Sequence, residues 1–479
     1  MERKNAWKTY TDDELAELET LSAGYIDFIS KNKTEREFAS SAIAEAEAAG
    51  YVPLEDAIAE NRTLKPGDKV WADTHGKALM LIEVGTEPME KGFNILGAHI
   101  DSPRLDVKQN PLYESSDLAY LDTHYYGGIK KYQWVTLPLA IHGVVAKTDG
   151  TVVPVVVGED ASDPVFCVTD LLPHLGGEQM QKKANNVVEG EALDLLVGGR
   201  PLVVEKDDGS DEDGDDDRPE WEKAADKEPV RAMLLKVLSE KYGICEEDFL
   251  SAELEIVPAG RARDLGFDRS MVLAYGQDDK VCAYTSLVAQ LAVENPGRSA
   301  VTILVDKEEI GSVGATGMQS RFFENTIAEV MELAGEGGSL KAQRALKASR
   351  MLSSDVSAGF DPSYPNVFET KNAAYLGRGL VFNKFTGSRG KSGSNDTSAE
   401  FVARVRKVMD DADVAFQTAE LGKVDIGGGG TIAYIPANYD MDVIDSGVPV
   451  LSMHAPWEVT SKADIYEARK GYEAFLLNA

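Results

Sequence analysis

The chain has few cysteines and no long apolar run. Three cysteines, Cys167, Cys245 and Cys282, are scattered over 479 residues, which is too few for a disulfide framework and predicts a reducing compartment. The N-terminal stretch has no apolar segment and soon turns acidic, unlike a signal peptide. No stretch reaches the ~18 consecutive apolar residues that a membrane helix needs. We therefore expect a cytoplasmic protein without a membrane partner.

Basic residues are also scarce relative to acidic ones. The chain has 49 Lys and Arg against 81 Asp and Glu, a formal net charge of −32 at pH 7. Such a chain repels the phosphates of nucleic acids, so DNA and RNA are excluded as main partners. Its 479 residues exceed the ~100–200 residues of a usual domain, and 43% of them are apolar. A soluble globular chain of two or three compact units is expected.

The pattern of predicted elements changes twice along the chain. Residues 1–102 begin with two helical segments, each opened by a Thr-x-x-Glu capping pattern, and continue into strand-like runs. Residues 103–254 consist of short β-type runs separated by turn signals. Helices and buried strands return over 255–479, and an amphipathic helix is expected at 461–478. We therefore predict an α/β domain built from 1–102 and 255–479 and interrupted by a β-rich inserted domain.

A strongly acidic segment lies at about 205–228 in the insert. It contains 13 acidic and 4 basic residues, which predicts a solvated, disordered surface loop. A calcium-binding loop would place an acid five residues before a glycine. The residues five positions before Gly214 and Gly209 are Gly209 and Val204, so the calcium pattern is absent.

Several predicted strands end at a histidine or a carboxylate. The runs are GAHID at 97–101, YGQDD at 275–279, VDKEE at 305–309, SSD at 353–355 and SMH at 452–454. Functional groups gather at the carboxyl ends of strands in open α/β sheets. Imidazole suits zinc, and bridging carboxylates hold two cations close together, so the pattern predicts a divalent-metal site. Each run is weak evidence alone, because adjacent acids such as Glu308 and Glu309 are common on exposed faces.

A family resemblance joins these runs into one site. The motifs are, in chain order, GAHIDSPR, GQDDKVCAYTSL, DKEEIGS, SSDVSAGFDPSYP and LSMHAPWE. They resemble the five metal-site motifs of the aspartyl aminopeptidase and vacuolar aminopeptidase family of dinuclear zinc exopeptidases. The resemblance covers nearly the whole chain. It implies a zinc-exopeptidase-like mixed sheet with flanking helices, interrupted by the β-rich insert.

The resemblance also implies an activity. A member of this family removes the N-terminal residue of short peptides with two divalent metal ions per subunit, here zinc, with cobalt or manganese as alternatives. It is a homo-oligomer, and the family assembles shells of twelve subunits. The N-terminal residue that it prefers stays open, because KKYQWVTLPLA at 130–140 replaces the family's charged Trp-Phe-Asp-Arg-Asp-Leu stretch. We predict a preference broader than acidic residues.

The resemblance implies a role for each matching residue. The metal ligands are His99, Asp278, Glu309, Asp355 and His454, with Asp278 bridging both ions. Glu308 is the general base, and Asp101 orients His99 through its other ring nitrogen. Which ion Glu309 binds stays open. The substrate-binding residues are Lys384, Gly429 and Thr431.

Two other functions fit parts of the pattern. A carboxypeptidase or deacylase would use the same metal core, but the insert directly after GAHIDSPR and the spacing from Asp101 to Asp278 favour an aminopeptidase. A binding protein with a degenerate site is disfavoured because no expected ligand is missing.

Overall fold

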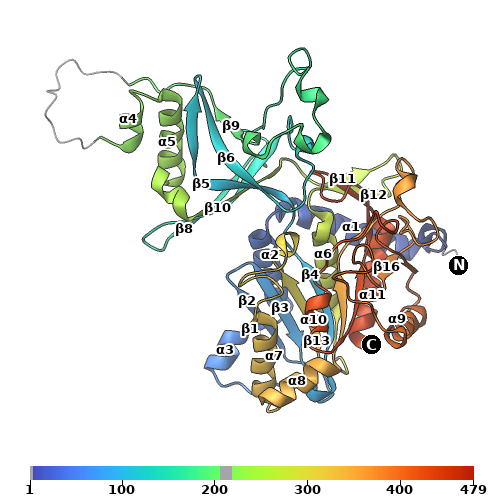
Figure 1. The fold of residues 1–479 in the computed structure, drawn as a ribbon. Coiled ribbons are helices and arrows are strands. Elements are labelled where there is room, and N and C mark those ends of the chain that lie inside the picture. The colour runs from blue at the N-terminus through green and yellow to red at the C-terminus, as the bar shows by residue number, and fades with distance from the viewer. Residues whose placement is uncertain (1–3, 205–217) are drawn as a thin grey trace. The chain divides into compact units, whose positions relative to one another are not determined.

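A mixed nine-stranded sheet forms the centre of the larger part of the chain (Figure 1). The computed structural model describes residues 4–204 and 218–479. In sheet order the strands are β1 (Val52–Pro53), β2 (Lys69–Thr74), β3 (Ala78–Glu83), β13 (Ala300–Val305), β4 (Asn94–His99), β14 (Arg350–Ser354), β18 (Asp442–Gly447), β16 (Leu380–Asn383) and β17 (Phe416–Thr418). The central strands β13, β4, β14 and β18 run parallel, whereas β3 and β16 pair antiparallel with this group.

Alternate residues of the central strands point into two separate cores. Leu79 and Leu96 belong to one core, whereas Met80 and Ile95, their neighbours in the chain, belong to the other. This alternation follows from the two-residue period of a strand. Because both faces are covered, the strands are apolar along nearly their whole length, as expected for parallel strands buried on both sides.

Helices cover both faces of the sheet. The first core includes residues of α1 (Asp12–Lys31), α2 (Glu35–Ala48), α6 (Gln277–Ala292), α9 (Ala399–Asp411) and α11 (Lys462–Asn478). The second core includes residues of α3 (Leu54–Ala59), α7 (Phe322–Leu333), α8 (Ser339–Ala348) and α10 (Tyr434–Ala437). Both predicted capping boxes are present, at Thr11 with Glu14 and at Thr34 with Glu37. The predicted α/β fold with a mixed sheet and flanking helices is therefore confirmed.

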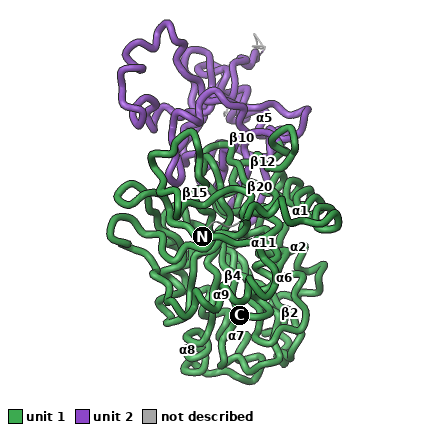
Figure 2. The backbone as a smooth tube through the Cα atoms, turned by 90° about the vertical axis from the view of Figure 1, so that its right-hand side faces the viewer, with its two compact units in different colours: residues 1–102, 261–479 green, residues 103–260 purple. Residues whose placement is uncertain are grey.

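The chain separates into two units, which Figure 2 shows in different colours. Unit 1 comprises Met1–Ser102 and Arg261–Ala479, and unit 2 comprises Pro103–Gly260. The expected boundary after residue 254 falls inside β10 (Ala252–Pro258). This strand pairs antiparallel along its whole length with β7 (Leu139–Ala146), and that pairing keeps it in unit 2.

Unit 2 is built on an antiparallel six-stranded sheet. Its order is β8 (Val152–Val157), β7, β10, β5 (Arg104–Ser115), β6 (Leu118–Tyr126) and β9 (Leu195–Gly198). Two helices, α4 (Glu220–Ala224) and α5 (Pro229–Tyr242), follow β9.

Part of the segment expected to be disordered is helical. Helix α4 begins after Pro219 and has Glu220 and Glu222 in its first turn and Lys223 in its last turn. These charges favour a helix because they complement its dipole. Residues 205–217 of the acidic segment lie outside the described residues.

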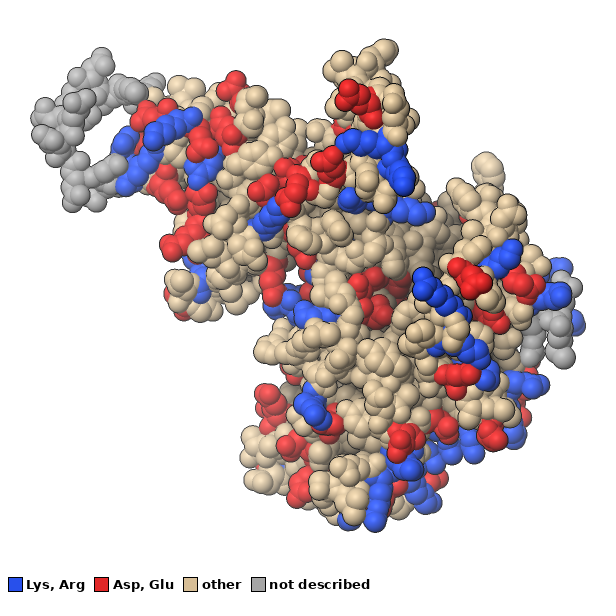
Figure 3. Space-filling model, in the orientation of Figure 1, with Lys and Arg blue, Asp and Glu red and all other residues tan. Residues whose placement is uncertain are grey.

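On the face shown in Figure 3, Asp and Glu side chains are interspersed with Lys and Arg side chains. Within the described ranges, no helix is both long enough and apolar enough to cross a bilayer.

Candidate metal centre

The strand ends of unit 1 bring the predicted ligands together. His99 is the last residue of β4 and lies beside Val305, the last residue of the parallel strand β13. On the other side of β4, β14 ends at Ser354, directly before Asp355. Parallel strands end at the same edge of a sheet, so residues from three distant segments meet there. Asp278 joins them from the first turn of α6, and His454 from the segment between β19 (Pro449–Val450) and β20 (Glu458–Ser461).

Asp278 lies between the two histidines. Its Oδ1 atom is 3.2 Å from Nε2 of His99, and its Oδ2 atom is 3.2 Å from Nε2 of His454. The Oε1 atom of Glu309 is 3.6 Å from the same nitrogen of His454. The Oε2 atom of Glu308 is 4.0 Å from Nε2 of His99. Each oxygen of the Asp278 carboxylate therefore faces a different imidazole.

Among the described residues, the donor atoms form three overlapping sets. In each set, one atom of every member lies within 4.8 Å of the others: His99, Asp278 and Asp355; Asp278, Glu309 and His454; and His99, Glu308 and Glu309. We name the first set the His99 triad and the second the His454 triad. Asp278 belongs to both, which is the position of a bridging carboxylate. Each triad offers three nitrogen and oxygen ligands, the number that catalytic zinc sites use while keeping a position open for water or substrate.

Three buried donor atoms support the fit to a cation. Among the described residues, Nε2 of His99, Oδ1 of Asp278 and Oε1 of Glu309 are buried and make no hydrogen bond. Burying a polar atom without a partner costs about 1–3 kcal/mol. A divalent cation between these atoms would satisfy all three, so the residues present fit the metal ions that the motifs predict.

Burial and mutual repulsion shift the pKa values of the carboxyl groups. Burial, followed by the charge of Asp278, raises the pKa of Glu309 and of Asp355 well above the usual range. Burial also raises the pKa of Glu308 to about 7. For Asp278, burial would raise the pKa, but the neighbouring imidazoles of His454 and His99 outweigh it and hold the pKa well below the usual range. The site thus concentrates negative charge where a cation would neutralise it.

Asp101 connects one histidine to both glutamates. Its Oδ1 atom is 3.2 Å from Nδ1 of His99, the ring nitrogen that faces away from Asp278. Its two carboxylate oxygens also accept hydrogen bonds of 3.2 Å from the backbone N–H groups of Glu308 and Glu309. These glutamates lie in a short 3₁₀ turn, Glu308–Ile310, after Lys307 adopts a left-handed conformation with φ of 69°. Asp101 therefore contacts both His99 and the backbone of this turn.

The three expected substrate-binding residues contact other groups. The Nζ atom of Lys384 lies 2.7 Å from Oδ1 of Asp396, in a half-exposed ion pair. The hydroxyl of Thr431 donates a hydrogen bond of 2.6 Å to Asp445. The backbone N–H of Gly429 donates one of 3.2 Å to the carbonyl of Thr386. None of these partners is a member of either triad.

The sequence reasoning missed Glu458. Its carboxylate accepts hydrogen bonds from the backbone N–H groups of Asp278, at 3.0 Å, and of His454, at 2.7 Å. The sequence signal was an acid four residues after His454, at the start of a strand that is buried in the fold.

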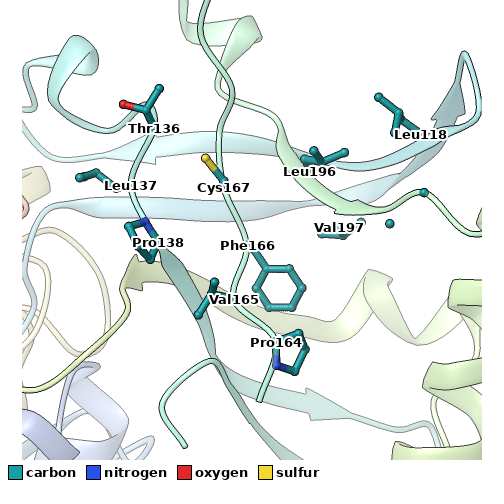
Figure 4. Close-up of a pocket in the computed structure, with 12 residues that line it drawn as sticks. Leu118, Thr136, Leu137, Pro138, Pro164, Val165, Phe166, Cys167, Leu196 and Val197 are labelled. Carbon is teal, nitrogen blue, oxygen red and sulfur yellow. The ribbon is translucent and has the colours of Figure 1, made fainter. Parts of the chain in front are cut away.

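A pocket in unit 2 has a different character. The labelled residues of Figure 4 include Pro164, Val165, Phe166 and Leu196, and the described lining contains no carboxylate or histidine. The thiol of Cys167 is the one ligand-type side chain in the described lining, and none of the predicted metal ligands lies there.

Comparison with known proteins agrees with the geometry of the site. A family model described as aminopeptidase I zinc metalloprotease (M18) matches residues 28–476. A probable M18 family aminopeptidase 1 from Clostridium acetobutylicum is 60% identical over 477 residues, which cover 100% of this chain and 98% of that protein.

Solved structures show the same fold. An M18 aminopeptidase from Thermotoga maritima has a TM-score of 0.91 at 43% identity, and aminopeptidase I from Clostridium acetobutylicum has 0.89 at 57%; each match covers 100% of both chains. A dodecamer of the S. cerevisiae protein mApe1 shares the fold at 19% identity, with a TM-score of 0.75 and coverage of 96% of this chain and 97% of that one. The family resemblance is confirmed: the chain belongs to the M18 family of zinc metallo-aminopeptidases.

Proposed function

We propose that the chain removes single N-terminal residues from short peptides with two divalent metal ions per subunit. The observation that carries the proposal is the pair of triads that share Asp278. One ion would be held by the His99 triad and the other by the His454 triad. Glu309 also forms a set with His99 and Glu308, and we assign it to the ion bound by His454 because its Oε1 atom lies 3.6 Å from Nε2 of that histidine. Zinc suits the mixed imidazole and carboxylate ligands, and cobalt or manganese are the alternatives.

The acid–base chemistry is assigned to Glu308. When bound, the two ions polarise the scissile carbonyl and make water a stronger nucleophile near neutral pH. Glu308 is not grouped with Asp278 in any of the three sets and shares one only with His99 and Glu309. Its side chain is 16% exposed, compared with 4% for Glu309. It is therefore open to substrate and water. Glu308 takes the proton of the attacking water and delivers it to the leaving amine.

Asp101 has a positioning role in this proposal. It holds His99 through Nδ1 and leaves Nε2 directed at the shared carboxylate. A carboxylate that accepts a hydrogen bond from the second ring nitrogen fixes the tautomer of a ligand histidine and raises its basicity.

We expect the chain to accept a wider range of N-terminal residues than Asp and Glu alone. Gly429 and Thr431 would line the part of the site that faces the substrate. Thr431 donates a hydrogen bond to Asp445, and the charge of Glu308 contributes to the raised pKa of Asp445, so this segment lies near Glu308. The charge of Lys384 is partly compensated by Asp396, which also binds Lys391. A lysine paired in this way attracts an acidic substrate side chain less than a free lysine would.

We also propose that the chain forms a homo-oligomer of twelve subunits in the cytoplasm. The yeast dodecamer with the same fold supports this number. Several apolar side chains of unit 2 are exposed in the single chain, including Leu175 at 71% and Met180 at 77%. Such side chains are typical of surfaces that are covered on assembly. The three cysteines, none of them in a disulfide, agree with a reducing compartment.

Metal content and substrate class test the proposal together. Wild-type protein dialysed against zinc should hold two ions per chain by mass spectrometry, and His99→Ala and His454→Ala should each hold fewer. His124→Ala, at an exposed histidine of unit 2, is the matched control and should keep both ions. Hydrolysis of aminoacyl p-nitroanilides, without hydrolysis of N-acyl amino acids, is expected. The reverse substrate pattern would favour a deacylase or carboxypeptidase.

A further inference from the structure

One buried carboxylate links the two segments that carry the His454 triad. Glu458 is 1% exposed and is the first residue of β20, in a three-stranded sheet where it pairs with Ala274 of β12 (Met271–Ala274). Its Oε2 atom accepts from the backbone N–H of Asp278, and its Oε1 atom accepts from the backbone N–H of His454. Its carbonyl accepts a further hydrogen bond of 2.7 Å from the side chain of Gln277.

The His454 segment has a backbone conformation that local sequence does not favour. His454 is left-handed, with φ of 64°, and this conformation costs a residue with a β-carbon roughly 1–2 kcal/mol. Such a conformation persists only where surrounding contacts hold it. The hydrogen bond from the His454 N–H to Glu458 is a contact of this kind. Asp278, with φ of −80° and ψ of 108°, is extended rather than helical, although the helix α6 includes it.

We infer that Glu458 is a positioning residue that sets the spacing between Asp278 and His454. Each carboxylate oxygen binds one of the two backbones, so the side chain holds these ligands of the His454 triad, 176 residues apart in the chain, in one arrangement. The inference rests on the proposed function, because the spacing matters only if the triad binds an ion. Groups behind metal ligands typically contribute 10- to 100-fold to metal affinity.

Asp464 provides a matched control. It is also a buried carboxylate that accepts two backbone hydrogen bonds, each of 2.7 Å, from Gly377 and Gly379. Neither donor belongs to a triad. Replacing Asp464 removes a buried acceptor of backbone hydrogen bonds, as replacing Glu458 does, but it leaves the segments of Asp278 and His454 unchanged.

The test compares zinc affinity and the cobalt spectrum of the full chain. In Glu458→Gln one oxygen becomes an amide NH₂, which faces a backbone donor, so one of the two hydrogen bonds is lost. Glu458→Asp keeps the charge but shortens the reach by one methylene. Competition with a chromophoric chelator should show that both variants bind the weaker zinc ion 10- to 100-fold less tightly than wild type. The d–d absorption of the cobalt-loaded variants should change, whereas Asp464→Asn should retain wild-type affinity and spectrum.

Three outcomes would contradict the inference, and they differ in what else they affect. Wild-type affinity and spectrum in both Glu458 variants, with a loss in His454→Ala, would overturn the positioning role alone. Equal losses in Glu458→Gln and Asp464→Asn would also overturn it, because general destabilisation would account for them. Wild-type affinity in His454→Ala would overturn both the proposed site and the positioning role.

Discussion

The adjacent glutamates Glu308 and Glu309 allow catalysis and metal binding to be separated by one substitution each. Glu309, with 4% of its side chain exposed, belongs to the His454 triad, whereas Glu308 is 16% exposed and does not. Glu308→Gln keeps the volume of the side chain and removes the proton acceptor. It costs little stability, because the nearest cationic group recorded for the carboxylate is Nε2 of His99, at 4.0 Å.

The expected loss follows from the role of the base. Removing a general base typically lowers the rate ~10²–10⁴-fold, which corresponds to about 2.7–5.5 kcal/mol in the activation barrier. Glu308→Gln should therefore lose this factor in kcat while it retains two zinc ions per chain. Glu309→Gln should instead lose zinc, because a triad is left with two ligands.

The assay measures kcat on leucine p-nitroanilide at saturating zinc, with the zinc content of the same samples. Far-ultraviolet circular dichroism of both variants controls for folding. A kcat within about 3-fold of wild type in Glu308→Gln would refute its assignment as the base. Loss of zinc in Glu308→Gln equal to that in Glu309→Gln would show that the two residues are not divided in this way.

Three further predictions concern other parts of unit 1. Lys384→Ala should change the ratio of kcat/KM for N-terminal Asp to that for Leu by less than about 3-fold, because the lysine is paired with Asp396. A selective loss of more than about 100-fold for Asp substrates would contradict this expectation. Removing metal with a chelator should lower the Tm of the wild-type protein by several degrees, because bound ions stabilise the folded state. The same chelator should leave the Tm of the double variant His99→Ala/Asp278→Ala unchanged. Burial raises the pKa of Asp464 to about 8 despite two backbone hydrogen bonds, so the folded chain binds a proton that the unfolded chain releases above about pH 4. The free energy of unfolding should therefore fall as pH rises through this window, and Asp464→Asn should reduce that slope in urea titrations; an unchanged slope would count against the raised pKa.

Local features of the fold were predictable because they depend on neighbours in the chain. The capping boxes at Thr11 and Thr34 require only residues three positions apart, and both are present. The helix at 462–478 was expected to be amphipathic, but most of its length is buried, including Lys462 and Asp464. The sequence pattern does not show that a buried charged side chain forms ion pairs with residues far away in the chain, as Lys462 does with Glu19 and Asp264.

The end of the insert could not be placed as well as its start. Residue 254 lies inside β10, and its assignment to unit 2 depends on pairing with β7, more than a hundred residues earlier in the chain. Turn signals mark a change of element, but they do not identify the sheet that the next strand joins.

By itself, the sequence determined the family, the α/β class, and the five predicted strand runs that end in histidines or carboxylates. These follow from residue types and their order along the chain. Only the tertiary structure decided that Asp278 lies between His99 and His454, that Glu309 lies 3.6 Å from His454, and that Lys384 pairs with Asp396. The physical reason is that these contacts depend on the strand order β13-β4-β14 and on the loops beyond it, which bring together segments separated by up to 355 residues. The two hydrogen bonds accepted by Glu458 also depend on the tertiary structure. Glu458 lies four residues after His454, but it reaches the N–H of Asp278 only because the first turn of α6 packs beside it.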